Sequence, residues 1–313
     1  MSGGAVVIIG NFDGVHRGHR AVLEAGARLA EERGLAVRLL TFDPHPSVTL
    51  GRVPPPTLTT LERKRELLLR ACPAAELVVR SFDRAFAALA PEAFAERVLV
   101  HELGARVVMV GDDFRFGRGR TGGMAELVAL GERLGFATIG APLVGDDEGP
   151  WSSTRIRMHV QRGEVEAAAR LLGRPHLVSG VVSHGQRRGR TLGFPTCNLA
   201  SVPEALPANG VYAVLVDRVD SGEARALGRG VCNLGMRPTI GDLDNPLLEA
   251  HVFDLDQELY GAHLRVHLVA RLRGERRFAG LDELRRQIAQ DCEDALASLA
   301  EAQPDPAARG AWS

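Results

Sequence analysis

Hydrophobic and polar positions change their spacing near the middle of the chain. In the first half, short apolar runs typical of buried strands alternate with segments whose apolar residues recur every three or four positions, as on amphipathic helices. This alternation predicts strands near residues 5–10, 36–42, 76–80, 106–111 and 136–140, and helices near 18–33, 60–71, 91–103 and 122–134. Such a pattern indicates an α/β domain built on a doubly wound parallel sheet with right-handed crossovers.

The second half, beyond the Gly-Arg-Pro sequence at 173–175, has a strand-like period. Short apolar stretches near 178–182, 210–216, 229–234, 247–253 and 264–270 are separated by turns rich in Gly, Pro and Asn. They predict a small antiparallel β-barrel, followed by a terminal helix over about 281–300. We therefore expect two domains, residues 1–172 and 176–302, and a disordered tail over 303–313, which is rich in Pro, Ala and Gly.

Composition narrows the classes of partner. The chain has 313 residues, of which 45% are hydrophobic and 25% are charged, so it can bury the cores of two domains. A formal net charge of −1 gives no excess charge for binding nucleic acid or a membrane surface. No secretory signal is apparent, and no apolar run approaches the ~20 residues that span a bilayer, so we expect a cytoplasmic protein. Cys72, Cys197, Cys232 and Cys292 lack CxxC spacing, which favours reduced thiols over disulfides or a zinc site.

The stretch GNFDGVHRGH, residues 10–19, joins the first predicted strand to the first helix. A helix start has unpaired backbone N–H groups and a partial positive charge, which together attract a phosphate. His16 and His19 are three residues apart at the first helical turn, so both are expected to face that phosphate as donors. Gly14 and Gly18 let the backbone approach a ligand closely. We predict a phosphate-binding site here, in preference to a structural role for the two histidines.

Polar residues also follow other predicted strands, where ligands bind in doubly wound sheets. Asp43 and His45 lie in TFDPHP, whose two prolines fix the chain, and a plain turn is the alternative. The loop 110–123 contains three arginines suited to anions, and its residues Phe114 and Phe116 could face a planar ring. For this loop, a flexible solvated segment is the alternative.

A hydroxyl-rich segment, SSTRIR at 152–157, precedes a further helical pattern. Its hydroxyl groups can cap a helix that begins near Thr154, and the same helix start can hold phosphate oxygens. Two arginines in the next turn are placed to clamp a polyphosphate. We predict nucleotide binding, with helix capping alone as the alternative.

In the second half, residues 180–199 form a glycine-rich stretch with three arginines that leads into Pro-Thr-Cys-Asn. The stretch lacks Gly-Lys-Ser/Thr, so it is not a Walker loop. The hydroxyl of Thr196 and the side-chain carbonyl of Asn198 are hard oxygen ligands of the kind that Mg²⁺ takes, and a hairpin turn is the alternative. Taken by itself, Glu249 is a solvated carboxylate on a strand.

The motifs GNFDGVHRGH, TFDPHP, VGDDFRFG and SSTRIR resemble, in the same order, those of the adenylyltransferase module of bacterial bifunctional riboflavin kinase/FMN adenylyltransferases, often called FAD synthetases. The resemblance covers the first half and implies a Rossmann-like nucleotidyltransferase domain. In it, His16 and His19 contact the ATP phosphates and stabilise the transition state. The resemblance also assigns ATP or phosphate binding to Gly10, Phe12, Asp13, Gly18, Asp113, Ser153, Thr154 and Arg157. Asp113 stands where some members have Asn, and Trp151 replaces a small aliphatic residue.

In the second half, GRTLGFPTCNL resembles the riboflavin kinase motif GRxLGFPTANL, with Cys197 in place of the common Ala. PANGVY, NLGMRPT and LEAH follow in that family's order. The resemblance implies that Thr196 and Asn198 organise Mg-ATP, while Glu249 is the general base that takes the proton from the 5′-hydroxyl of riboflavin. It assigns flavin or ATP binding in the kinase to Gly185, Arg190, Gly193, Pro195, Asn233 and Arg237.

Together these motifs predict an enzyme with two ATP sites. One site phosphorylates riboflavin to FMN, and the other transfers the adenylyl group of ATP to FMN, with Mg²⁺ as cofactor and no nucleic-acid or membrane partner. The alternatives are a chain in which only one module is active, and a flavin-binding protein that releases neither ADP nor pyrophosphate. A cytidylyltransferase would share the paired histidines but would leave the sequence beyond Gly173 without a role.

Overall fold

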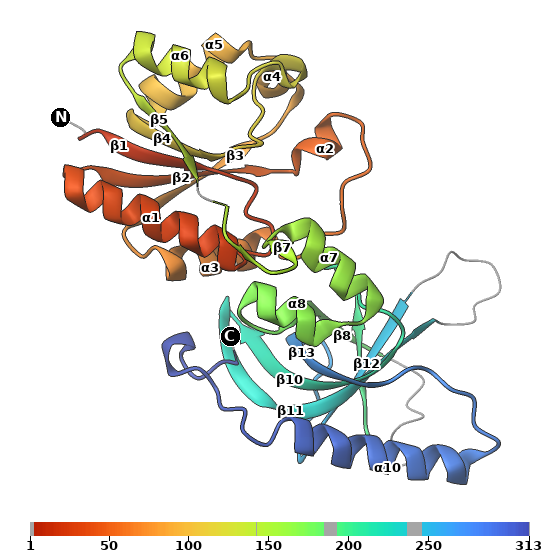
Figure 1. Ribbon diagram of the computed structural model, residues 1–313. Coiled ribbons are helices and arrows are strands. Elements are labelled where there is room, and N and C mark those ends of the chain that lie inside the picture. The colour runs from red at the N-terminus through yellow and green to blue at the C-terminus, as the bar shows by residue number, and fades with distance from the viewer. Residues whose placement is uncertain (1–2, 142, 185–192, 237–245, 313) are drawn as a thin grey trace. The chain divides into compact units, whose positions relative to one another are not determined.

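The computed structural model describes residues 3–141, 143–184, 193–236 and 246–312 (Figure 1). The chain separates into two compact units, Met1–Ser152 and Ser153–Ser313. Each unit has hydrophobic clusters of its own.

A five-stranded parallel sheet forms the centre of the first unit, as the apolar pattern predicts. Its strands are β1 (Ala5–Ile9), β2 (Ala36–Asp43), β3 (Ala75–Ser81), β4 (Ala105–Gly111) and β5 (Ala137–Ala141), in the spatial order β3-β2-β1-β4-β5. Ile8 of β1 pairs in parallel with Leu39 of β2 on one side and with Met109 of β4 on the other. The strand order reverses between β1 and β4, so the topological switch point lies at this pair.

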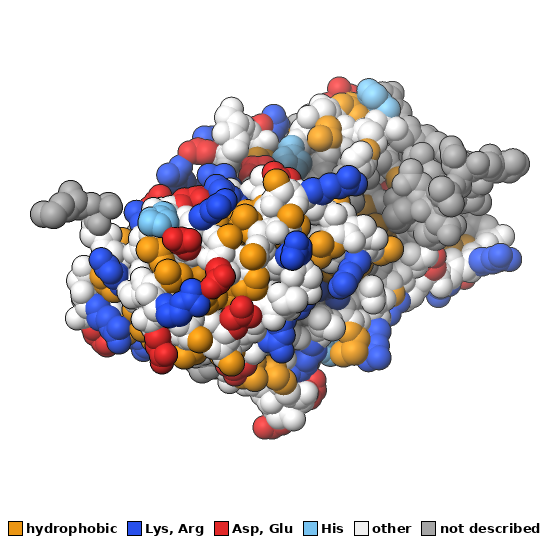
Figure 2. All heavy atoms as spheres, turned by 90° about the horizontal axis from the view of Figure 1, so that it is seen from above, with side chains coloured by type: hydrophobic (Ala, Val, Ile, Leu, Met, Phe, Trp, Pro, Cys, Tyr) orange, Lys and Arg blue, Asp and Glu red, His pale blue; other side chains and the backbone are white. Residues whose placement is uncertain are grey.

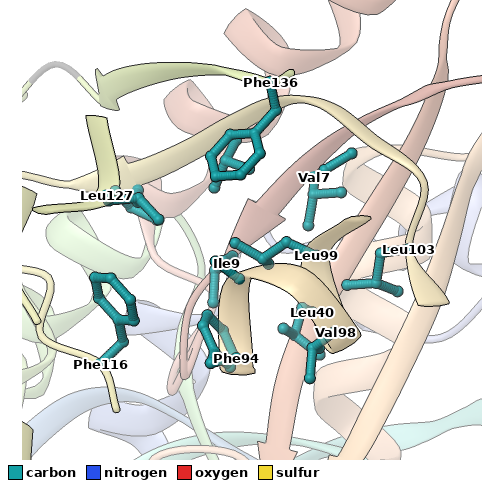
Figure 3. Packing of buried hydrophobic residues seen from close by; sticks show 14 of the residues in the cluster. Val7, Ile9, Leu40, Phe94, Val98, Leu99, Leu103, Phe116, Leu127 and Phe136 are labelled. Atoms are coloured by element: carbon teal, nitrogen blue, oxygen red, sulfur yellow. The ribbon is translucent and has the colours of Figure 1, made fainter. Parts of the chain in front are cut away.

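Helices cover both faces of the sheet. They are α1 (Arg17–Arg33), α2 (Pro46–Thr49), α3 (Leu61–Ala71), α4 (Arg84–Ala87), α5 (Pro91–Ala93), the π-helix η1 (Phe94–Glu102), the 3-10 helix η2 (Arg118–Arg120) and α6 (Met124–Leu134). Successive residues of a buried strand point to opposite faces. Ile8 therefore packs with Leu23 of α1, whereas Ile9 belongs to the opposite cluster with Leu99 of η1 and Leu127 of α6 (Figure 3).

Several short elements of the first unit differ from the sequence-based prediction. The helix expected over 91–103 is the short α5 followed by the π-helix η1. Helices α2 and α4, and the ribbon of β6 (Gly145–Asp146) and β7 (Gly149–Pro150), are additional elements. Each contains four residues or fewer, which is too few for a periodic pattern to identify.

The second unit contains the predicted antiparallel barrel. Its strands are β8 (His176–Ser183), β9 (Cys197–Ala200), β10 (Gly210–Asp220), β11 (Glu223–Met236), β12 (Pro246–Val252) and β13 (His263–Arg273), closed in the order β10-β11-β12-β9-β8-β13. Its helices are α7 (Ser153–Arg162), α8 (Val165–Leu172), α10 (Leu281–Ser298) and the 3-10 helix η3 (Pro306–Ala308). Strand β9, which was not expected, closes the barrel between β12 and β8.

Alternate residues of the barrel strands face inward and outward. Tyr212 and Val214 of β10 lie in the interior cluster, where Val165 of α8 also packs. Val211 and Ala213 point outward, where α10 covers them through residues that include Ala295. The barrel interior is thus filled with side chains, and α10 shields part of its outer surface from water.

Helices α7 and α8 are joined to the barrel by Arg271 of β13. Its backbone N–H donates to the carboxylate of Glu166 at 3.1 Å, and its guanidinium donates to the carbonyl oxygens of Asn209 at 2.9 Å and Arg162 at 3.4 Å. These contacts explain why the second compact unit begins at Ser153. The predicted domain boundary at residues 172–176 stays a prediction.

The C-terminal tail differs from the expected disorder. Asp305 caps η3 by accepting from the backbone N–H of Ala307 at 2.9 Å. The backbone N–H of Trp312 donates to the buried Asp217 at 2.9 Å, and its indole N–H donates to the carbonyl of Val216 at 3.1 Å. A Pro-, Ala- and Gly-rich composition predicts disorder, but one aromatic anchor supplies the apolar contact that orders this segment.

Acidic and basic side chains are interspersed over the face shown in Figure 2, in keeping with the near-zero net charge. Among the helices in the described ranges, none is both long and apolar enough to span a membrane.

Candidate active sites

Two of the polar segments lie at the switch point of the sheet. His16 and His19 follow β1, and Asp113 follows β4, which is the neighbour of β1. Parallel strands end at the same edge of a sheet, so the structure brings these residues to the edge where ligands of doubly wound folds bind.

The loop after β1 is held in an unusual conformation. Phe12 and Val15 are non-glycine residues with φ angles of 48° and 39°, and both are buried. Such conformations are costly and persist where surrounding contacts hold them, often at functional sites. A Cβ on Gly10 would lie 3.0 Å from the Phe12 ring, and that ring meets His19 edge-on with 5.3 Å between centroids. Phe12 therefore supports the histidine within the loop.

His16 begins helix α1 as its N-cap. Its Nδ1 accepts from the backbone N–H of His19 at 3.3 Å. A neutral ring that accepts at Nδ1 carries its proton on Nε2, so Nε2 is a donor. The two imidazole rings stack with 3.6 Å between centroids. A Cβ on Gly18 would lie 3.0 Å from both Nδ1 of His16 and the carbonyl oxygen of Trp151, so a larger residue would crowd both groups.

Asp13 has a different environment from a phosphate contact. Its buried carboxylate accepts from the backbone N–H groups of Leu58 at 3.0 Å and Thr59 at 3.1 Å, and from the Thr59 hydroxyl at 3.3 Å. That hydroxyl oxygen accepts in turn from the backbone N–H of Gly14 at 3.0 Å. Asp13 therefore clamps the loop after β1 to the segment that leads into α3. Because a carboxylate repels a phosphate, Asp13 is better suited to positioning the loop than to contacting the phosphate itself.

We expect Asp13→Asn to lower the free energy of unfolding by about 1–3 kcal/mol, because a neutral amide oxygen is a weaker acceptor than the carboxylate and the amide NH₂ would face the backbone N–H of Leu58. Urea denaturation followed by circular dichroism measures the change. Asp147→Asn, at an exposed loop position, is the matched control and should leave the midpoint unchanged. An unchanged midpoint for Asp13→Asn would contradict the clamp.

The TFDPHP segment joins the same edge of the sheet. Nδ1 of His45 accepts from the backbone N–H of Ser47 at 3.2 Å and thereby caps α2. Its Nε2 lies 3.4 Å from the side-chain amide of Asn11. The loops after β1 and β2 are therefore in direct contact.

The Gly- and Arg-rich loop after β4 divides into two parts. Phe116 is 6% exposed and packs against Phe94 in the core, with Phe114 stacked on it at 5.6 Å. The expectation that this pair faces a planar ligand is wrong for Phe116, because the core of the unit already covers it. Asp113 is exposed and lies within the turn that the N–H of Phe114 closes on the carbonyl of Gly111 at 2.9 Å.

Ser153, Thr154 and Arg157 lie in the first turns of α7, as expected for the SSTRIR segment. Helix α7 belongs to the second compact unit. Trp151, two residues earlier, belongs to the first unit, where the guanidinium of Arg17 lies 4.2 Å from its ring centroid.

Sequence reasoning did not select Lys64 as a candidate site residue. It is the one lysine among 38 basic residues, and it lies in the second turn of α3. Burial lowers the pKa of its ammonium, against the opposing influence of the carboxylates of Asp13 and Asp43. The signal that points to it is compositional, because a chain that uses Arg nearly everywhere keeps a compact ammonium here.

In the barrel, three predicted kinase residues form one row. Asn198 of β9 pairs with Glu249 of β12, which pairs with Asn233 of β11. Side chains of directly opposed residues lie on the same face of a sheet. Leu248 and Ala250 point into the barrel, so the row lies on its outer face. The family resemblance predicts site roles for these three residues, and the strand register puts them side by side.

Asn198 has the features of a ligand for a hard cation. Its side chain is 5% exposed, and within the described part of the chain its buried Oδ1 has no hydrogen-bond partner. A buried carbonyl oxygen without a donor is costly unless a ligand satisfies it. Mg²⁺ takes such oxygens together with substrate phosphates, so the residues fit this ion. The described residues contain no group of three or more His, Cys, Asp or Glu side chains that could hold a metal.

The segment before Asn198 is anchored to β12. Nδ1 of His251 lies 2.7 Å from the carbonyl oxygen of Pro195, and the exposed Thr196 lies between that anchor and Asn198. Gly193 has a φ of 88°, a conformation that favours glycine. Three of the predicted kinase residues lie outside the described residues: Gly185, Arg190 and Arg237.

Cys197, which stands where the resemblance has Ala, turns toward the barrel interior with Cys232. Burial raises the pKa of Cys197 to about 11 and that of Cys232 to about 12. Both thiols are therefore protonated at neutral pH and act as packing residues.

Comparison with known proteins assigns both halves of the chain to one family. A family model of FAD synthetase matches residues 1–155, and one of riboflavin kinase matches residues 172–299. The bifunctional riboflavin kinase/FMN adenylyltransferase of Escherichia coli K12 is 39% identical over 292 residues, which cover 92% of this chain and 90% of that protein. The Bacillus subtilis protein of the same name is 37% identical and covers 93% and 92%.

A solved structure shares the fold along most of the chain. The crystal structure described as a macrolide-efflux protein from Streptococcus pneumoniae matches with a TM-score of 0.81 at 29% identity, covering 93% of both chains. The two family models match in the same order as the two units of the structure. This chain therefore belongs to the family of bifunctional riboflavin kinase/FMN adenylyltransferases.

Proposed function

We propose that His16 and His19 hold the polyphosphate of ATP in the adenylyl-transfer reaction of this bifunctional enzyme. The phosphate of FMN attacks the α-phosphorus of ATP, the bond to the β-phosphate breaks, and FAD and pyrophosphate leave. The Nε2–H of His16 and the start of α1 provide donors for the charge that develops on the phosphate oxygens. No residue needs to form a covalent intermediate, because positioning and charge neutralisation carry the reaction.

The other motif residues support this site in separate ways. Gly10 and Gly18 leave room for Phe12 and His16, and Asp13 clamps the loop, as their contacts indicate. Ser153, Thr154 and Arg157 contribute hydroxyl groups and a guanidinium to the ATP phosphates. The sequence position of α7, two residues after Trp151, supports that assignment. Asp113 contributes a carboxylate from the loop that follows β4, the neighbour of β1 in the sheet.

In the kinase reaction, Glu249 is the general base. Its carboxylate takes the proton of the 5′-hydroxyl of riboflavin, the hydroxyl oxygen forms a bond to the γ-phosphorus of ATP, and ADP leaves. The row of Asn198, Glu249 and Asn233 supports this role, because it puts the carboxylate between two amide side chains on one face. Gly193 and Pro195 shape the chain that brings Thr196 and Asn198 to this row.

Mg²⁺ is the cofactor that the barrel site fits. Thr196 and Asn198 would hold it, and when bound it neutralises charge on the ATP phosphates. The observation that carries this assignment is the buried Oδ1 of Asn198, which has no donor among the described residues.

We expect Asn198→Ala to raise the Mg²⁺ concentration for half-maximal FMN formation by about tenfold or more, since a ligand oxygen is lost. Asn198→Asp, which keeps an oxygen at this position, should recover most of the Mg²⁺ affinity. Titration of kinase activity with MgCl₂ measures both variants, and thermal unfolding reports whether the barrel remains folded. Equal Mg²⁺ dependence in all three proteins would contradict the assignment.

The substrates are riboflavin, FMN and ATP, and we place the reactions in the cytoplasm. Four cysteines without a disulfide among the described residues suit a reducing compartment. Product analysis of the purified protein with riboflavin, ATP and MgCl₂ tests the assignment of both steps. FMN should appear with ADP, and FAD with pyrophosphate. Bound flavin without either by-product would favour a binding protein.

A further inference from the structure

A second carboxylate reaches the kinase row from the end of β13. Gly235 of β11 lies two residues beyond Asn233, so both face the same side of the strand. A Cβ on Gly235 would lie 2.4 Å from Oε1 of Glu275 and 3.5 Å from Nδ2 of Asn233. The carboxylate of Glu275 therefore occupies the space that a side chain at position 235 would fill, beside the Asn233 amide.

Glu275 is held in this position by one hydrogen bond and by the fixed end of β13. Its Oε2 accepts from the side-chain amide of Asn209 at 3.1 Å. Arg273, two residues earlier, makes a bidentate ion pair with Asp291 of α10 at 2.8 and 2.7 Å, which fixes the end of β13. In the described ranges, Oε1 has no hydrogen-bond partner, and the residue is exposed. One oxygen thus anchors the carboxylate while the other is available to a ligand.

The order of these residues across neighbouring strands distinguishes an ATP end of the site from a riboflavin end. Asn198 on β9 comes first, Glu249 on β12 is central, and Asn233 on β11 follows. Glu275 lies beside Asn233, where it covers Gly235, two residues further along β11. If the cation and the ATP phosphates lie at Asn198, the attacked hydroxyl lies at Glu249. The remainder of the riboflavin side chain then continues toward Asn233 and Glu275.

Charge distinguishes the two ends of this row. A carboxylate that does not hold a cation repels a polyphosphate, so Glu275 is unsuited to the ATP end. It is an acceptor only, and hydroxyl groups are the donors that suit it. The ribityl chain of riboflavin is a neutral polyol, which supplies such donors next to the 5′-hydroxyl.

We propose that Glu275 is a substrate-binding residue of the kinase, whose Oε1 accepts a hydrogen bond from a ribityl hydroxyl of riboflavin, with Gly235 conserving the space for it and Asn209 fixing its orientation. The proposal rests on the proposed roles of Asn198 and Glu249. It gives the kinase a way to select a polyol alcohol in preference to a simple primary alcohol.

The first test is a comparison of Michaelis constants in the full-length protein. Glu275→Gln should raise the KM for riboflavin by about 10- to 100-fold, the loss expected for a hydrogen bond to a charged group, while the KM for ATP stays within about twofold. Gly235→Ala should act in the same direction, because its methyl group displaces Oε1. Glu223→Gln, at the exposed opposite end of β11, is the matched control and should leave both constants unchanged.

The second test uses riboflavin analogues that lack the 2′-, 3′- or 4′-hydroxyl. One of them should be a poorer substrate for the natural enzyme, and that penalty should disappear in Glu275→Gln, because the partner is already lost. A riboflavin KM unchanged by Glu275→Gln, or a KM increase for ATP in its place, would overturn the proposal. So would equal analogue penalties in both proteins.

Failure of this inference is separable from failure of the proposed kinase roles. Substantial FMN formation by Glu249→Gln would remove the general base and the direction of the row with it. An inactive Glu249→Gln together with an unchanged riboflavin KM in Glu275→Gln would reject the role of Glu275 alone. Thermal unfolding of each variant identifies a loss of fold as the cause of any lost activity.

Discussion

Glu249→Gln should reduce kcat for FMN formation by about 10²- to 10⁴-fold, the range that a positioned general base contributes. Glutamine keeps the size of the side chain and its place between Asn198 and Asn233 on the outer face of the barrel. It cannot take the proton from the 5′-hydroxyl of riboflavin. The measurement is FMN formation from riboflavin and ATP, followed by chromatography with fluorescence detection.

The same variant should form FAD from supplied FMN at the natural rate, because the paired histidines lie in the other compact unit. Glu293→Gln, at an exposed position of α10, is the matched control and should keep both activities. Retention of FMN formation by Glu249→Gln would show that another group takes the proton.

His19→Ala should have the opposite selectivity. We expect FAD synthesis to fall by about 100- to 1000-fold, as when one donor to a developing charge is removed, while FMN formation is unchanged. The variant also removes the ring that stacks on His16 and contacts Phe12. Pyrophosphate release from ATP and FMN measures the effect.

An exposed histidine provides the control for that variant. His101→Ala, at the end of η1, should leave FAD synthesis unchanged. An undiminished FAD yield in His19→Ala would refute the role of this side chain at the phosphates.

The architecture follows from the sequence because both units bury nearly continuous apolar strands. The run Ala5–Ile9 is buried along its whole length, as a central parallel strand requires, and the motif that follows it lies at the edge where ligands bind. The hydrophobic pattern does not predict strand β9. It has four residues, follows a proline and includes the polar Asn198, so no alternation identifies it.

Contacts between distant segments account for most of the remainder. Asp13 accepts a hydrogen bond from Leu58, which is 45 residues further along the chain. Glu275 fills the space beside Gly235 of β11, and the periodicity of the sequence does not reveal this contact. The motif resemblance assigned Asp13 to ATP or phosphate binding and gave no sign of its contacts as a clamp. For the C-terminal tail, composition predicts disorder, but two hydrogen bonds from Trp312 hold it against the barrel.

We expect the two sites to act in sequence, with FMN released by the kinase before it is adenylylated. The most direct measurement supplies riboflavin, ATP and MgCl₂ to Glu249→Gln, to His19→Ala and to an equimolar mixture of the two, and follows FAD. We expect little FAD from either protein alone, accumulation of FMN with His19→Ala, and recovery of FAD synthesis in the mixture. A mixture that forms no more FAD than the separate proteins, although each keeps its remaining activity, would contradict it.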